Sequence, residues 1–144
     1  LLLQSADNKI ITEDNLEVVT KKVPNKEEIQ NALFAWKVCK YVKSNAIVFA
    51  ASEQTLGIGA GQMSRIDSGK IAASKAKEFG FSLNGASMAS DAFFPFRDNV
   101  DNAHELGIKC IIQPGGSIKD EEVIQAANEA DMSMLFTKVR HFRH

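Results

Sequence analysis

The sequence has little cysteine and no long hydrophobic run, and each shortage excludes a class of protein. Its two cysteines, Cys39 and Cys110, lie too far apart to form a Cys-x-x-Cys metal or redox pair. The apolar runs are far shorter than the roughly 20 residues that a membrane-spanning helix needs. Residues 1–3 lack the basic start and the apolar length of a signal peptide. These shortages favour a soluble, cytoplasmic globular protein.

No charge of one sign dominates either. The chain has 17 Lys and Arg against 18 Asp and Glu, which leaves a net charge of −1. This balance gives no electrostatic footprint for nucleic acid or for an anionic membrane, and we expect neither as a partner. The 144 residues, 44% of them hydrophobic, suit one domain with a sizeable core.

Several motifs that carry chemistry are missing as well. The sequence has no Walker loop, no Gly-x-Ser-x-Gly elbow, no zincin His-Glu pair and no Cys/His nucleophile signature. No cluster of metal-ligating residues appears, so we expect no zinc site. His104 stands in a helical stretch, where a surface position explains it.

Strand and helix patterns alternate along the chain. Residues 1–24 read as an extended N-terminal arm, and residues 25–144 read as a single α/β domain. A helix is predicted over 26–42, because Asn25 and Glu28 can form a capping box before an apolar stripe. Further helices are predicted over 65–79, 99–106 and 117–130, and strands over 46–50, 55–60, 86–90, 108–112 and 132–136. The alternation predicts a three-layer α/β sandwich around a mainly parallel sheet.

Four segments follow predicted strands or end the chain, and loops after strands are where an open α/β sheet places its ligands. In residues 57–65, glycines allow close approach of a ligand to the backbone, and the next helix can receive an anion at its N-terminus. Arg65 adds a guanidinium that matches phosphate or carboxylate. A plain glycine-rich turn is the alternative.

Residues 90–99 hold three phenylalanines around a proline, with two aspartates and an arginine. The functional interpretation is a wall that stacks a flat heterocycle while a carboxylate or amide reaches its polar edge. The structural alternative is a hydrophobic plug, with Asp91 or Asp98 capping the next helix.

Residues 113–120 and the basic end of the chain are the other two segments. Ser117 and Asp120 have the spacing of a capping box, and the same backbone amides could also bind a ligand carboxylate. Residues 140–144 contain two arginines and two histidines. Their structural alternative is a frayed, solvated tail.

These segments resemble, in one order, the C-terminal part of a family of bifunctional purine-biosynthesis proteins. That family joins an aminoimidazole carboxamide ribonucleotide (AICAR) transformylase to an inosine monophosphate (IMP) cyclohydrolase. The resemblance covers nearly all of the chain, and its most specific part is Phe-Phe-Pro-Phe-Arg-Asp at 93–98. The other matching stretches are 43–46, 57–65, 90–92, 113–117 and 139–144. It implies a zinc-free, cytidine-deaminase-like fold in which this chain is the second copy of a duplicated transformylase, and so a fragment lacking its N-terminal part.

The resemblance also implies a reaction and a set of contacts. A formyl group would pass from 10-formyltetrahydrofolate to the 5-amino group of AICAR, at a site on a homodimer interface. A potassium ion occurs near the position of Asp91 in some members. The implied AICAR contacts are Asn45, Arg65, Phe93 and Arg140, and the implied folate contacts are Ile66, Asp98, Ser117 and Ile118. The residue types agree, since arginine suits phosphate or carboxamide and an asparagine amide both donates and accepts.

One departure from the family concerns catalysis. The family's catalytic Lys-His pair belongs to the first copy, and Lys43-Ser44-Asn45 resembles its duplicated counterpart, with serine in place of the histidine. Of the catalytic residues, the resemblance then implies only Asn45 here, in an orienting role. The proton acceptor for the amine and the cation for the developing oxyanion are then missing. We expect the chain to orient substrates for the parent enzyme while being inactive alone. The alternatives are a nucleotide- or folate-binding module, and a structural piece that buries its sheet only against a lost copy. A proton-transfer role for His141 or His144 stays open.

Overall fold

The structure is a computed structural model that describes residues 3–144, so residues 1 and 2 of the predicted arm lie outside the described part. The described strands form one sheet in the order β1-β6-β5-β4-β2-β3. The strands are β1 (Glu17–Val18), β2 (Ile47–Ala51), β3 (Gln54–Gly59), β4 (Ser87–Ser90), β5 (Cys110–Gln113) and β6 (Ser133–Phe136). The helices are the 3₁₀ turn η1 (Glu13–Asn15), α1 (Lys26–Cys39), α2 (Arg65–Glu78), α3 (Asp98–Glu105) and α4 (Asp120–Glu129).

The sheet is mixed, with four of its six strands pointing the same way. Strands β4, β5 and β6 pair in parallel, whereas β2 runs antiparallel to both β3 and β4, and β1 runs antiparallel to β6. The β2–β3 pair is a hairpin whose two turn residues, Ser52 and Glu53, have φ values of 51° and 57°. Two positive φ values are what a type I′ turn needs to match strand twist.

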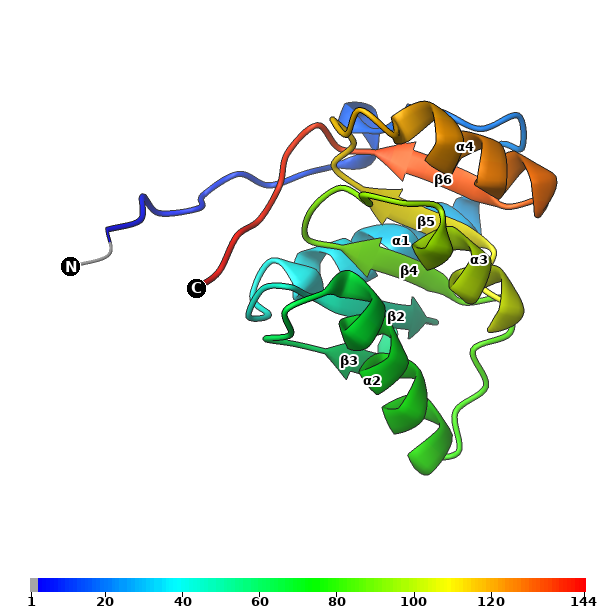
Figure 1. Ribbon diagram of the computed structural model, residues 1–144, viewed down its shortest axis with the longest axis horizontal. Helices are drawn as coiled ribbons and strands as arrows, with labels where there is room; N and C mark the ends of the chain where they lie inside the picture. Colours follow the sequence, from blue (N-terminus) through cyan, green and yellow to red (C-terminus); the bar gives the residue numbers. More distant parts are fainter. Residues whose placement is uncertain (1–2) are drawn as a thin grey trace.

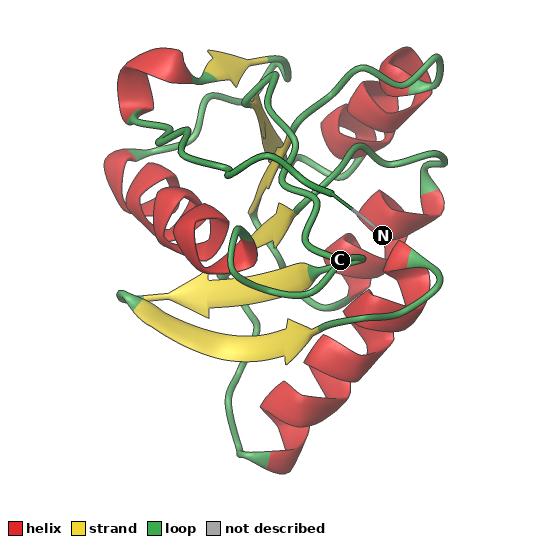
Figure 2. Cartoon of the chain, turned by 90° about the vertical axis from the view of Figure 1, so that its left-hand side faces the viewer, coloured by secondary structure: helices red, strands yellow, loops and turns green. Residues whose placement is uncertain are grey.

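The expected three-layer sandwich is confirmed, as Figures 1 and 2 show. Helix α1 covers one face of the sheet, where Trp36 packs with Ile11 of the arm and Val48 of the sheet. Helices α2, α3 and α4 cover the other face around a second buried cluster. Because both faces are covered by helices of this chain, the idea of a sheet buried only against a lost copy is wrong.

Two glycines of β3, the strand at one side of the sheet, allow helix α2 to lie close against that strand. A Cβ atom on Gly57 would lie 2.1 Å from the Ala72 carbonyl oxygen, and one on Gly59 would lie 1.8 Å from that of Ser68. Neither separation is possible for real atoms. For Gly57 and Gly59 the expectation that the glycines make room for a ligand is therefore wrong, since it is α2 that comes close; for Gly61 it stays a prediction.

Of the predicted helix caps, one is confirmed and two are wrong, and α1 ends at Cys39, three residues before its predicted end at 42. The capping box is confirmed, because Asn25 Oδ1 accepts from the Glu28 amide at 2.8 Å. Helix α4 starts three residues later than predicted, so Ser117 is not its N-cap. Asp98 does not cap α3, because it is the first residue of that helix. In the described part of the chain, no helix has the length and apolarity needed to cross a bilayer.

Candidate functional site

The predicted segments meet at one edge of the sheet, the left edge in Figure 1 and the edge facing the viewer in Figure 2. Strands β3 to β6 end there, and β2, which runs the opposite way, begins there. Backbone hydrogen bonds join the segments to one another: Gly61 N to Lys43 O (2.8 Å), Asp91 N to Ala46 O (3.4 Å), His141 N to Asp91 O (3.0 Å) and Lys138 N to Pro114 O (3.0 Å). The sheet therefore gathers residues that are up to about a hundred positions apart in sequence.

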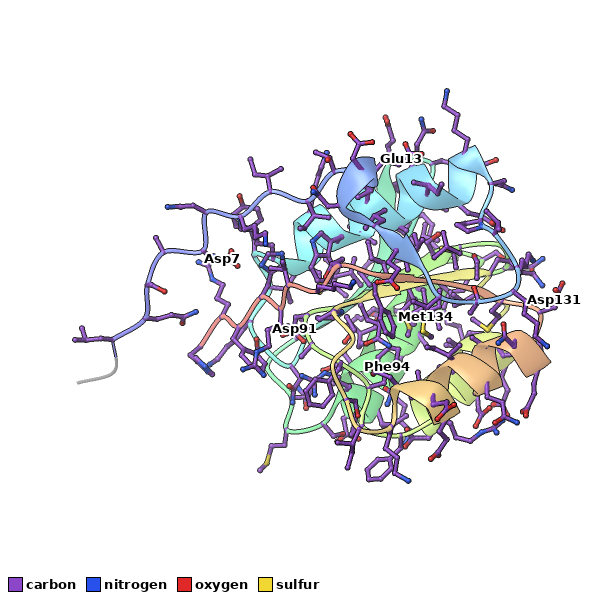
Figure 3. The ribbon with its side chains drawn as sticks, turned by 90° about the horizontal axis from the view of Figure 1, so that it is seen from above. Asp7, Glu13, Asp91, Phe94, Asp131 and Met134 are labelled. Atoms are coloured by element: carbon purple, nitrogen blue, oxygen red, sulfur yellow. The ribbon has the colours of Figure 1, made fainter. Side chains whose placement is uncertain are left out.

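A buried ion pair lies at the centre of this edge. Arg65 Nη2 is 3.8 Å from Asp91 Oδ1, with the Asp91 side chain 0% exposed and the Arg65 side chain 14% exposed. Within residues 3–144, neither carboxylate oxygen of Asp91 nor Nε of Arg65 has a hydrogen-bond partner. A buried ion pair without further hydrogen bonds contributes little to the stability of a fold, so a pair kept in this state marks a candidate functional centre. The label in Figure 3 locates Asp91.

Burial governs the ionisation of this centre. It raises the pKa of Asp91, against the opposing effects of the Ser44 hydroxyl, the Ala46 backbone and the Arg65 charge. It lowers the pKa of Arg65, which the Asp91 charge partly offsets. Burial also raises the pKa of the nearby Cys39 thiol, whose Sγ lies 3.7 Å from the Ala46 carbonyl oxygen. A thiol held in its neutral form is no nucleophile, so the chemistry of this centre is that of the arginine and the carboxylate.

Asn45 borders the ion pair from the segment before β2. Its side-chain Nδ2 donates to the Gln62 carbonyl oxygen at 3.0 Å, and its own carbonyl oxygen accepts from the Ser68 hydroxyl at 2.7 Å. Gln62 precedes α2 and Ser68 lies in its second turn. These bonds fix Asn45 against the helix that begins with Arg65.

Phe93 and Arg140 share a shallow pocket of about 340 Å³, whose lining also includes the turn at 114–116 and Lys138. The half-buried Phe93 ring offers an aromatic face, and the exposed Arg140 lies 4.8 Å from the Phe142 ring centroid. Two of the four predicted AICAR contacts thus line one pocket, whereas Asn45 and Arg65 lie in the neighbouring buried centre. Lys138 was not singled out from the sequence. Its Nζ lies 2.6 Å from Glu17 Oε2.

The predicted folate contacts share an edge but no pocket in the described residues. Ile66 lines a groove of about 230 Å³ between α2 and α3, together with Asn99 and Asn102. Asp98 is exposed and accepts from the Asn99 amide, while Ile118 is 100% exposed. All of these residues lie near the amino-terminal ends of α2, α3 and α4.

The turn before α4 is closed by its own helix. Asp120 accepts from the Gly116 amide at 2.7 Å and from the Ser117 amide at 3.1 Å. Ser117 Oγ accepts from the Lys119 amide at 3.0 Å. The Gly116 and Ser117 amides, which we expected could bind a ligand carboxylate, therefore donate to the carboxylate of Asp120 instead.

The end of the chain is ordered by buried contacts, so the alternative of a frayed tail is wrong for His141. That side chain is 2% exposed, its ring centroid lies 4.7 Å from that of Trp36, and its Nδ1 contacts the Asp7 carboxylate. His144 is exposed, with its ring 6.0 Å from that of Phe142. No sequence signal linked Asp7 to His141, which are 134 positions apart. Across residues 3–144 no group of three or more His, Cys, Asp or Glu side chains lies close enough to hold a metal.

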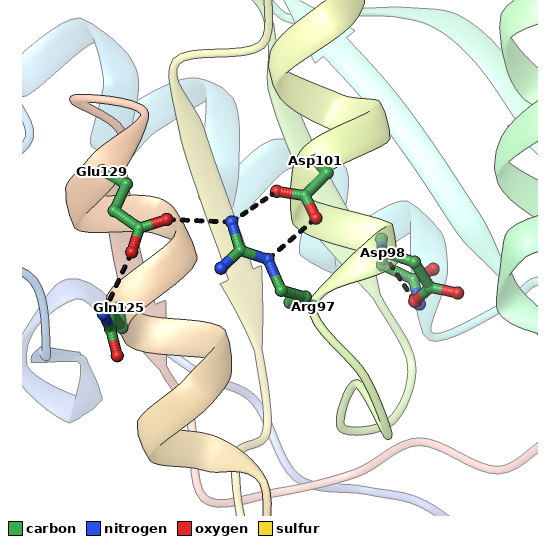
Figure 4. A network of polar contacts seen from close by, with 6 residues as sticks. Arg97, Asp98, Asp101, Gln125 and Glu129 are labelled. Carbon is green, nitrogen blue, oxygen red and sulfur yellow. Dashed lines mark hydrogen bonds and ion pairs between the residues drawn. The ribbon is translucent and has the colours of Figure 1, made fainter.

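Arg97 fastens the loop after β4 by joining α3 to α4 (Figure 4). Its guanidinium donates to both carboxylate oxygens of Asp101 at 3.0 Å and to Glu129 at 2.9 Å. Gln125 donates to the other oxygen of Glu129 at 3.0 Å. The bonds to Arg97 lower the pKa of Asp101 below its ordinary value.

We expect Arg97→Ala to lower the stability of the chain slightly at neutral pH, since the pair is solvent-exposed. The Asp101 contribution is complete above the ordinary Asp pKa of about 3.9 and is lost as the pH falls through the lower folded-state pKa. Thermal denaturation of the wild type and of Arg97→Ala should show a stability difference that shrinks on acidification. Lys75→Ala is the control for the loss of an exposed ion pair in general, because it removes the pair between Lys75 and Glu78. A difference that stays constant down to the most acidic pH would contradict this role.

Comparison with known structures finds a similar fold in two other proteins. The chain is similar to the apo form of dCMP deaminase from the cyanophage S-TIM5, with a TM-score of 0.51, 14% identity and coverage of 76% of this chain and 98% of that one. It is also similar to form 1 of Acinetobacter baumannii RibD, with a TM-score of 0.51, 14% identity and coverage of 75% of this chain and 33% of that one. At this identity the likeness concerns the fold alone, and it confirms the expected cytidine-deaminase-like architecture.

A family model described as AICARFT/IMPCHase bienzyme matches residues 1–75. The matched part is more than half of the chain and includes Arg65, one member of the buried ion pair, and Asn45. The chain therefore belongs to the AICARFT/IMPCHase bienzyme family of purine biosynthesis enzymes.

Proposed function

We propose that this chain is the substrate-orienting half of an AICAR transformylase, the second copy of a duplicated fold in a longer, cytoplasmic, homodimeric protein. The observation that carries the proposal is the joining of two features at one sheet edge. The buried Arg65–Asp91 pair and the Phe93–Arg140 pocket are linked by the single residue, Ala92, between Asp91 and Phe93 and by the hydrogen bond from His141 N to Asp91 O.

The AICAR side of this site has the groups that a ribonucleotide needs. Phe93 supplies a ring face for the flat imidazole, and Arg140 supplies an exposed cation at the same pocket for the phosphate. Arg65 and Asn45, in the adjoining centre, would contact the carboxamide. Burial of the Arg65 guanidinium supports this role, because charged hydrogen bonds are stronger where water is excluded.

The folate side has one groove, followed by exposed residues. The groove beside Ile66 offers apolar walls from Phe49 and Met88, with two asparagine side chains in its lining. Such amides can match the donors and acceptors of a pterin edge. Asp98, Ser117 and Ile118 lie further along the same edge, and the full exposure of Ile118 suits a surface that a cosubstrate or a partner copy covers.

The site has one acidic group, the Asp91 carboxylate, that could bind a potassium ion. The two oxygens of Asp91 fit the hard oxygen ligands that such a cation prefers. Asp91 would be the residue that holds it, and the ion would share the carboxylate with Arg65.

The reaction itself needs groups that this chain does not supply. When the AICAR amine attacks the formyl carbon, one group must take the amine proton and a cation must stabilise the oxyanion. Ser44 stands where the family has the catalytic histidine. His141 does not replace it, because its ring is buried against Trp36 and Asp7. The proton acceptor would come from the other copy of the fold.

Calorimetric titration of the chain with AICAR tests the half-site. We expect measurable binding, and we expect Phe93→Ala to weaken it by about tenfold, from the loss of a stacking contact of up to about 1.5 kcal/mol. Phe96→Ala is the matched control, because Phe96 lies in the same loop, is 58% exposed and does not line the pocket. Absence of heat up to millimolar AICAR, or equal effects of the two variants, would contradict the proposal.

A further inference from the structure

The C-terminal tail after β6 presents alternate residues to opposite sides. Val139 is packed against the cluster under α1, and His141 is buried on the same side against Trp36. Arg140 and Phe142 face the other way, where the guanidinium lies over the ring at 4.8 Å. In an extended segment, a shift of one residue would exchange these two sides. The position of Arg140 at its pocket therefore depends on what fixes the register of the tail.

His141 fixes this register through three contacts. Its backbone N donates to the Asp91 carbonyl oxygen at 3.0 Å, its ring packs against Trp36 at 4.7 Å, and its Nδ1 contacts the Asp7 carboxylate. Two residues further on, Arg143 exchanges hydrogen bonds with Ser44, from its N to Ser44 Oγ (3.0 Å) and from Ser44 N to its carbonyl oxygen (2.9 Å). Of these contacts, the one with Asp7 comes from the opposite end of the chain.

The N-terminal arm brings Asp7 to the tail and is itself held there. Lys40 of the segment after α1 lies 3.7 Å from Asp7 Oδ1 and donates to the Lys9 carbonyl oxygen at 2.9 Å. Gln4 donates to the Phe142 carbonyl oxygen. Figures 1 and 3 show the arm and the tail side by side, and the label in Figure 3 locates Asp7 on the arm.

We propose that Asp7 and His141 are positioning residues for Arg140, so that the N-terminal arm sets the affinity of the site for the phosphate of AICAR. This inference rests on the proposed function, in which Arg140 binds that phosphate. Without the Asp7 contact the tail gains freedom, and binding must then restrict it again, which weakens affinity. The bond-making step is unaffected, because neither residue faces the pocket.

A double-mutant cycle in the bienzyme that contains this segment tests the inference. We expect Asp7→Ala to raise the KM for AICAR by about tenfold with kcat within about twofold, and Arg140→Ala to raise it by more. In the double variant the KM should equal that of Arg140→Ala alone, because Asp7 acts through Arg140. Asp7→Asn retains an acceptor for the His141 ring and should recover most of the affinity.

Two controls separate positioning from other effects. Asp14→Ala removes an exposed carboxylate from η1, which lies in the same arm but not against the tail, and should leave KM unchanged. Thermal denaturation should show that Asp7→Ala, which alters a partly exposed side chain, leaves the enzyme folded. If Arg140→Ala raises KM while Asp7→Ala does not, or if the two effects add, the inference is overturned and the proposed function stands. If Arg140→Ala itself leaves KM unchanged, the proposed role of Arg140 fails and the inference fails with it.

Discussion

Arg65→Ala in the bienzyme is expected to lower kcat/KM for AICAR by about 100-fold or more, the effect of losing a buried, charged hydrogen-bonding partner of the substrate. Arg65 is the residue in the described part of the chain that combines a family match, a buried guanidinium and an unpartnered nitrogen. Steady-state kinetics with varied AICAR measure the effect. Activity close to that of the wild type would contradict the assignment of Arg65.

The same substitution also affects folding, and the design has to separate the two effects. Removing Arg65 leaves the buried Asp91 carboxylate without its cation, which costs about 3–5 kcal/mol when a buried pair is broken. The double variant Arg65→Ala/Asp91→Asn removes both charges and should regain much of that stability. We expect it to stay as inactive as Arg65→Ala. Recovery of activity together with stability would show that Arg65 matters only for the fold.

Gly59→Ala is expected to have the largest effect on stability, a loss of at least about 3 kcal/mol in the free energy of unfolding. The new Cβ would lie 1.8 Å from the Ser68 carbonyl oxygen, and that atom belongs to the backbone of α2 and cannot rotate away. The strand and the helix would have to separate. Because α2 begins with Arg65, the site would be lost with the packing. Urea denaturation of the chain measures the change.

Gly69→Ala is the matched control for this prediction. Gly69 lies in α2 itself, and a Cβ there meets nothing within 4 Å. Alanine in a helix interior is favoured over glycine by about 0.5–1 kcal/mol, so this variant should be slightly more stable than the wild type. Equal free energies of unfolding for Gly59→Ala and Gly69→Ala would contradict the close packing of β3 against α2.

Local patterns in the sequence were sufficient to predict most of the fold. Buried strands alternate with amphipathic helices, and the capping box of Asn25 and Glu28 is a contact over three residues, so both can be found without the tertiary structure. The start of α4 was predicted three residues early. Asp120 binds the Gly116 and Ser117 amides, and the preceding residues form a turn with Gly115 and Gly116 at positive φ. The same three-residue spacing of Ser117 and Asp120 fits a capping box and a closed turn equally well.

The candidate site was harder to predict, because its contacts cross the whole sheet. Sequence indicated Arg65, Phe93 and Arg140 by residue type and resemblance, and the structure places them on one edge. The sequence alone could not pair Arg65 with Asp91, or Asp7 with His141, since those pairs depend on strand order and on the path of the two termini. Gly57 and Gly59 show the converse problem: a glycine that serves helix packing and one that admits a ligand look alike in sequence.

Formyl transfer with purified components tests the central claim, that this chain holds the orienting half of a split site. AICAR and 10-formyltetrahydrofolate would be supplied at saturating levels to the chain alone, and then to the chain mixed with the segment of the bienzyme that carries the Lys-His pair. We predict no turnover by the chain alone and formyl transfer in the mixture, lost again when Arg65→Ala is used. Turnover at an enzyme-like rate by the chain alone would contradict the account.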